Sequence, residues 1–168
     1  IYYSDFPSIK PDQDFREIDF NTLPEGILKR CKIDISNSST ALTFISKQCC
    51  EFATVNPNYL GLNAKYAWMA TAQPKEGNAP LQEIKKTNLD NFSSLEWSAG
   101  KRGFVSEPIM IPDKNSLIED KGWIMVLTWD GSKKCTNLII LDSYDLSEIA
   151  ILKLPIAIPH GLHGSWVD

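Results

Sequence analysis

The sequence lacks an excess of positive charge, contains no long apolar run and has only two histidines. Its 17 lysines and arginines face 21 aspartates and glutamates, a net charge of −4, whereas a nucleic-acid-binding surface needs a basic stripe. The longest clearly apolar run, residues 123–127, is far shorter than the roughly 20 residues of a transmembrane helix. An apolar fraction of 43% still suffices for a packed core. These features exclude nucleic-acid-binding, membrane-spanning and disordered classes.

The common catalytic motifs are also missing. The sequence has no GxSxG, P-loop, GxGxxG or HExxH pattern, so it gives no support for a conventional hydrolase or nucleotide-binding enzyme. The two histidines, His160 and His163, lie among Pro159, Gly161 and Gly164, which disfavour the helix that an HxxH zinc pair would need. Taken alone, each is more typical of a loop histidine bonded to the backbone.

The four cysteines form neither a CxxC pair nor a regular framework. Cys49 and Cys50 are adjacent, which is a poor arrangement for ordinary disulfides. We therefore expect reduced thiols and a cytoplasmic location, and peripheral contact with a membrane is left open.

Helical periodicity is nearly absent. Ten prolines and nine glycines separate short apolar segments at roughly ten-residue spacing, which favours an all-β sandwich, barrel or propeller. The predicted strands are residues 15–21, 29–35, 41–46, 65–72, 81–87, 94–97, 107–111, 123–129, 137–142 and 149–154.

Two segments, residues 123–127 and 138–141, are apolar on both faces, which is typical of a strand in a sheet covered on both sides. Propeller blades are stacked in this way. Because a four-stranded blade takes roughly 40–50 residues, the chain has room for about three antiparallel blades and cannot close a ring. We expect residues 1–168 to form one such segment, with two blade faces uncovered that include strands 65–72 and 123–129.

Five motifs occur along the chain: CEFATVNP (residues 50–57), EPIMIP (107–112), EDKGW through TWD (119–130), NLIILD (137–142) and IPHGLHGSW (158–166). Together and in this order they resemble the motifs of the carotenoid cleavage oxygenases, over most of residues 14–168. Each motif alone is weak.

The resemblance implies the C-terminal blades of a seven-bladed β-propeller with an axial Fe(II) held by four histidines. It places the fourth ligand at His163, and it leaves His160 where the family usually has tyrosine. It makes Glu51 and Glu107 carboxylates that accept the Nδ1–H of ligating imidazoles, leaving Nε2 for iron. Without the resemblance, either glutamate is better explained as a solvated strand end.

The implied function is an O2-dependent dioxygenase that cleaves a conjugated C=C bond of a carotenoid, apocarotenoid or related polyene into carbonyl products. The family's other three histidines do not occur in this chain. We therefore expect a C-terminal segment that works with the N-terminal half of the same propeller and is inactive alone. The alternative is a non-catalytic β-propeller remnant, or a module binding apolar ligands or proteins.

Overall fold

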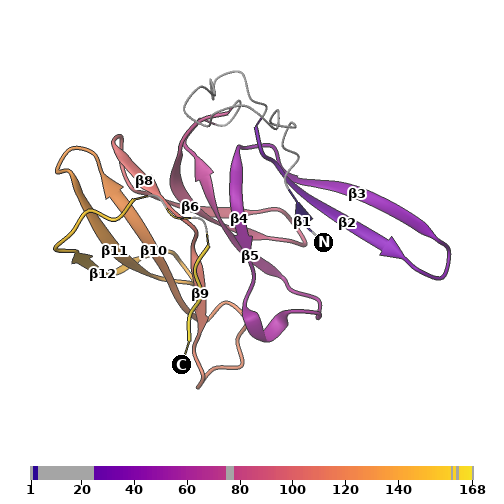
Figure 1. Ribbon diagram of the computed structural model, residues 1–168. Coiled ribbons are helices and arrows are strands. Elements are labelled where there is room, and N and C mark those ends of the chain that lie inside the picture. Colours follow the sequence, from indigo (N-terminus) through magenta and orange to yellow (C-terminus); the bar gives the residue numbers. More distant parts are fainter. Residues whose placement is uncertain (1, 4–24, 75–77, 160, 162, 168) are drawn as a thin grey trace.

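Three antiparallel β-sheets form the computed structural model, which describes residues 2–3, 25–74, 78–159, 161 and 163–167 (Figure 1). The all-β prediction is confirmed, and the number of sheets agrees with about three blades. Helix in the described residues is limited to the 3-10 turn η3 (Pro57–Tyr59). Accordingly, this part of the chain contains no helix of the length and apolarity that crossing a bilayer requires.

The central sheet has four strands in sequential order and lies between the other two sheets (Figure 1). It consists of β4 (Cys50–Thr54), β5 (Tyr66–Ala72), β6 (Leu81–Asn88) and β7 (Ser94–Ser98). The first sheet consists of β1 (Tyr2–Tyr3), β2 (Leu28–Asp34) and β3 (Ser39–Ser46). The third sheet consists of β8 (Gly103–Val105), β9 (Ile109–Pro112), β10 (Gly122–Asp130), β11 (Cys135–Asp142) and β12 (Glu148–Lys153).

Most predicted strands match observed ones within about two residues, because alternating or continuous apolar runs bounded by turns marked them. Three strands were missed: β1, which has only two residues, β4, which is interrupted by a bulge, and β8, which is short and begins at a glycine. The predicted strand at residues 15–21 lies outside the described residues.

The burial of β5 corrects one expectation. Strand 65–72 was expected on an uncovered blade face, yet β5 is buried on both sides because neighbouring sheets pack on each. In β10, Ile124 and Val126 are buried, whereas Trp123 on the opposite face is 40% exposed. One face of the third sheet is therefore buried, and the opposite face is only partly covered by described residues.

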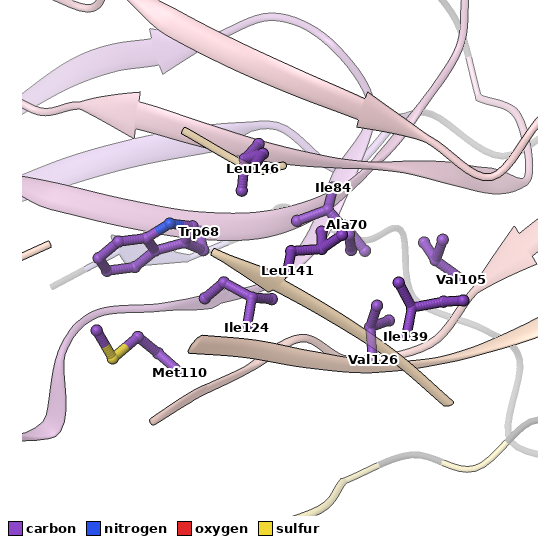
Figure 2. Close-up of a cluster of buried hydrophobic side chains, with 10 residues drawn as sticks. All are labelled: Trp68, Ala70, Ile84, Val105, Met110, Ile124, Val126, Ile139, Leu141 and Leu146. Atoms are coloured by element: carbon purple, nitrogen blue, oxygen red, sulfur yellow. The ribbon is translucent and has the colours of Figure 1, made fainter. Parts of the chain in front are cut away.

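The larger core lies between the central and third sheets (Figure 2). It combines apolar side chains that alternate along β5 and β10 with residues of β6, β8, β9 and β11. Its buried members are Trp68, Ala70, Ile84, Val105, Met110, Ile124, Val126, Ile139, Leu141 and Leu146. Burial of such side chains stabilises by about 25 cal/mol per Å² of apolar surface, so this contact fixes the two sheets together.

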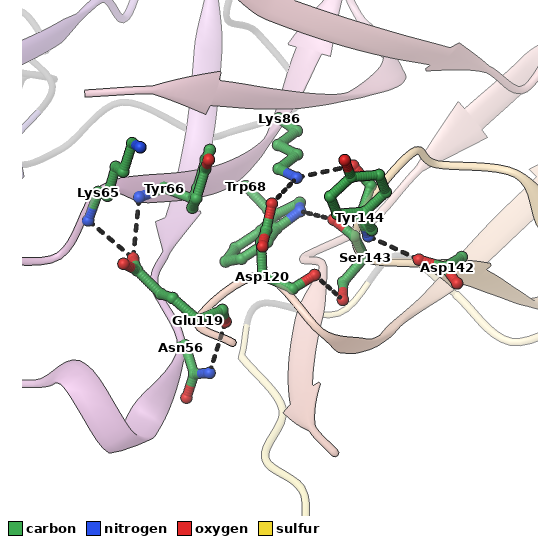
Figure 3. A network of polar contacts seen from close by, with 10 residues as sticks. All are labelled: Asn56, Lys65, Tyr66, Trp68, Lys86, Glu119, Asp120, Asp142, Ser143 and Tyr144. Carbon is green, nitrogen blue, oxygen red and sulfur yellow. Dashed lines mark hydrogen bonds and ion pairs between the residues drawn. The ribbon is translucent and has the colours of Figure 1, made fainter. Parts of the chain in front are cut away.

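A polar link crosses the same interface (Figure 3). Lys86 Nζ on β6 lies 2.5 Å from Asp120 Oδ2, in the loop before β10, and donates to the Tyr144 carbonyl at 2.7 Å. Trp68 Nε1 donates to the Ser143 carbonyl at 3.1 Å, and the Ser143 hydroxyl donates to the Asp120 carbonyl at 2.9 Å. Each of these groups is satisfied inside the protein, as buried polar groups must be.

Candidate active site

The site predicted from the C-terminal motif is built around Glu107 and His163. Glu107 lies between β8 and β9, and His163 lies in the segment that follows β12. Glu107 Oε1 is 3.2 Å from His163 Nδ1, and the backbone N–H of Gly164 donates to Glu107 Oε2 at 2.7 Å. Both oxygens of one carboxylate therefore hold the same His-Gly turn, although 56 positions separate Glu107 from His163.

This arrangement selects one form of the imidazole. A carboxylate accepts hydrogen bonds, so the contact favours a proton on Nδ1 of His163, and in the neutral imidazole Nε2 then carries the lone pair. That tautomer is the one in which a histidine binds a metal through Nε2, and the carboxylate contact also helps to orient the ring. The donor chemistry of His163 thus fits a metal ligand.

Gly164 allows the turn to approach β9 closely. A Cβ added to Gly164 would lie 3.2 Å from Ile109 Cδ1, closer than side chains usually pack. A side chain at position 164 would require Ile109 or the turn to shift by a few tenths of an ångström. The glycine of the motif therefore supports the carboxylate contact.

Phe52 makes a second contact with the imidazole. Its ring meets that of His163 edge to face, with centroids 5.8 Å apart and an interplanar angle of 87°. Phe52 lies on β4, so the central sheet reaches the same histidine as the third sheet. Sequence reasoning did not identify this residue, although it lies inside the motif that supplied Glu51.

Glu51 directly precedes Phe52 on β4, but it forms no hydrogen bond with His163. Its carboxylate forms no hydrogen bond or ion pair with any residue that the structure describes, and partial burial raises its pKa. A carboxylate buried without a partner is unfavourable, which is consistent with a partner outside this chain. Its predicted contact with a ligating imidazole stays a prediction.

The described residues supply one imidazole and not a complete metal site. Within residues 25–74, 78–159, 161 and 163–167, no three His, Cys, Asp or Glu side chains gather closely enough to hold a metal ion. His160 lies outside the described residues. A tight site would therefore need donors from elsewhere in addition to His163.

An apolar cavity of about 340 Å³ adjoins Glu107 and His163. Its lining includes Met125, Leu127 and Trp129, which point to the side of β10 opposite the buried Ile124 and Val126. In a propeller, a neighbouring blade would cover that face of β10.

Cys50 lies next to the predicted site residue Glu51 but is a poor nucleophile. All four cysteines are free of disulfides, as predicted. Burial raises the pKa of Cys50, the cysteine next to Glu51, to about 12. Its thiol therefore stays protonated at neutral pH, and a protonated thiol is a poor nucleophile.

Comparison with known proteins shows close relatives over the whole chain. The family model described as retinal pigment epithelial membrane protein (RPE65) matches residues 2–168. The apocarotenoid-15,15'-oxygenase of Synechocystis is 37% identical over 170 residues, which cover 100% of this chain and 35% of the relative. The 9-cis-epoxycarotenoid dioxygenase NCED6 of Arabidopsis thaliana is 28% identical over 118 residues, which cover 70% of this chain and 20% of the relative.

The solved structures agree with the sequence matches. The crystal structure of cobalt-substituted Synechocystis apocarotenoid oxygenase has a TM-score of 0.91 and 36% identity, and the match covers 99% of this chain and 35% of that one. The match thus spans about a third of the length of the Synechocystis oxygenase and about a fifth of the length of NCED6.

Proposed function

Because the chain belongs to the RPE65 family, which includes the carotenoid cleavage oxygenases, we propose that it forms part of a non-haem iron(II) dioxygenase. The substrate class is a carotenoid, apocarotenoid or related polyene, whose conjugated C=C bond is cleaved with O2 to two carbonyl products. The names of the relatives support this class, since they include an apocarotenoid oxygenase and an epoxycarotenoid dioxygenase.

The observation that carries the proposal is the contact of Glu107 with His163 and Gly164. Iron(II), when bound, would supply the activation of O2. In this chain, His163 would offer Nε2 to the metal, and Glu107 would hold the proton on Nδ1. The remaining donors and the other blades would come from the N-terminal half of the same propeller, consistent with the share of the relatives that this chain covers.

The test measures bound iron and cleavage in the full-length protein that contains this chain. The wild type should bind iron and convert an apocarotenoid into aldehyde products. His163→Ala should lose both, because a ligand is removed. Glu107→Gln should weaken iron binding by about 10–100-fold, the usual effect of changing a group that orients a ligand.

Glu148→Gln is the matched control. Glu148 accepts a hydrogen bond from Trp97 Nε1 at 2.8 Å on the exposed side of the molecule, so this change removes a carboxylate without touching His163. It should retain iron and activity. Iron content and turnover of the wild-type level in both His163→Ala and Glu107→Gln would overturn the roles assigned to these two residues. A wild type that neither binds iron nor cleaves an apocarotenoid would overturn the proposed function and favour a non-catalytic module.

A further inference from the structure

Phe52 has an unusual backbone conformation for a bulky residue. Its φ is +57°, in the left-handed region that side chains with a Cβ rarely occupy. Strained residues of this kind persist only where the surroundings hold them, and they concentrate at functional sites. Phe52 therefore combines a strained backbone with a position beside the candidate metal ligand His163.

The strain belongs to a β-bulge in β4. Glu51 pairs with Ala70 and Thr54 pairs with Trp68 on β5, so Phe52 and the residue after it together oppose a single residue. A left-handed residue at the first position of such a bulge is ordinarily glycine. Here a phenylalanine occupies it.

The bulge changes the face on which Phe52 lies. Without it, Cys50 and Phe52 would share one face of the sheet, and Glu51 would lie on the other. Cys50 instead packs in the core toward the first sheet, whereas Phe52 packs against the core toward the third sheet. Ala70, the cross-strand partner of Glu51, also lies in that core. Consecutive residues Glu51 and Phe52 thus face the same side.

We propose that the bulge exists to place Phe52 as a positioning residue for His163, an inference that rests on the function proposed above. The Glu107 contact holds the imidazole at Nδ1, but a single hydrogen bond leaves some freedom for the plane of the ring to tilt. The perpendicular ring of Phe52 restricts that tilt. Together the two contacts determine where the Nε2 lone pair points.

The interaction has a physical basis beyond burial. Aromatic rings prefer edge-to-face contacts because the edge of one ring is electropositive and the face of the other is electronegative. Such pairs are strong enough to change an equilibrium by about 2- to 12-fold. Loss of the Phe52 ring should therefore weaken metal binding moderately, while the Glu107 contact remains.

The experiment uses the full-length protein with Phe52→Leu, which keeps apolar bulk, and Phe52→Tyr, which restores the ring. Iron(II) affinity and the ligand-field absorption of the cobalt(II)-loaded protein are measured. Phe52→Leu should bind iron about 2- to 12-fold more weakly with a changed cobalt spectrum, and Phe52→Tyr should resemble the wild type.

Phe92→Leu is the matched control, since Phe92 also has a positive φ (63°) but lies in an exposed turn after β6. It should leave affinity and spectrum unchanged. If His163→Ala and Glu107→Gln lose metal but Phe52→Leu matches the wild type in affinity and spectrum, the positioning role is wrong and the proposed function stands. If the wild type itself binds no iron, the proposed function fails and the positioning role fails with it.

Discussion

The two faces of the central sheet are held in different ways. The face toward the third sheet carries the larger apolar core and the buried link between Lys86 and Asp120. The face toward the first sheet carries a smaller core, and the β2–β3 hairpin beyond it is largely exposed. Figure 1 shows this hairpin extending away from the other strands.

The difference shows where precision is needed. Phe52 lies on a strand of the central sheet, whereas Glu107 and His163 lie in segments that join or follow strands of the third sheet. None of the three comes from the first sheet. A metal ligand must be held within about 0.5 Å of its working geometry, which requires rigid supporting elements. We infer that the interface between the central and third sheets is the support of the site.

The largest effect is expected from breaking the buried ion pair. The side chains of Lys86 and Asp120 are 7% and 4% exposed. Asp120→Ala would leave the Lys86 ammonium buried with no opposite charge, which typically costs about 3–5 kcal/mol. Urea unfolding of the full-length protein measures this loss. The double variant Lys86→Met, Asp120→Ala removes both charges and should recover most of the stability, so an equally unstable double variant would contradict the explanation.

A smaller effect is expected on the other face. Leu28 is 3% exposed in the smaller core, and Leu28→Ala should cost about 2–3 kcal/mol, at the low end for buried leucines, because the hairpin beside it can partly collapse into the space. Leu42→Ala, at a side chain 55% exposed on β3, is the control and should change stability by about 0.5 kcal/mol or less. If Leu28→Ala lowered the free energy of unfolding as much as Asp120→Ala, the two faces of the central sheet would contribute equally to stability.

The sequence predicted most of the strands, because these depend on local pattern. Through the resemblance it also pointed to Glu107 and His163, which the structure brings into contact. It did not predict the buried Lys86, since a lysine on a strand normally indicates a solvated face. Nor could it predict the bulge at Phe52. Two-residue alternation assumes an uninterrupted pairing of strands, and a phenylalanine in the sequence does not indicate a left-handed backbone conformation. Features set by tertiary contacts between sheets were the ones missed.

The smallest effect on stability is expected at Glu51, on the face of the central sheet that packs against the third sheet. Burial raises its pKa in the folded protein, so the folded state binds the proton more tightly than the unfolded state. Its contribution is therefore fully favourable below the ordinary glutamate pKa and is lost as pH rises through the raised value. Glu51→Gln cannot ionise, so, where no imidazole pairs with Glu51, metal-free Glu51→Gln should match the wild type near pH 4 and be more stable than it at neutral pH.

Asp130→Asn is a control for Glu51→Gln, because the pKa of Asp130 is shifted in the opposite direction. Hydrogen bonds from the side chain and then the backbone N–H of Lys133 lower the pKa of the exposed Asp130 carboxyl. Its stabilisation is present above the ordinary aspartate pKa and is lost as pH falls through the lowered value, so Asp130→Asn should lose stability at neutral pH and match the wild type in acid. Unfolding by urea from pH 3 to pH 8 gives both profiles. A metal-free Glu51→Gln that is less stable than the wild type at neutral pH would show that the carboxylate has a favourable partner, and that burial does not govern its ionisation.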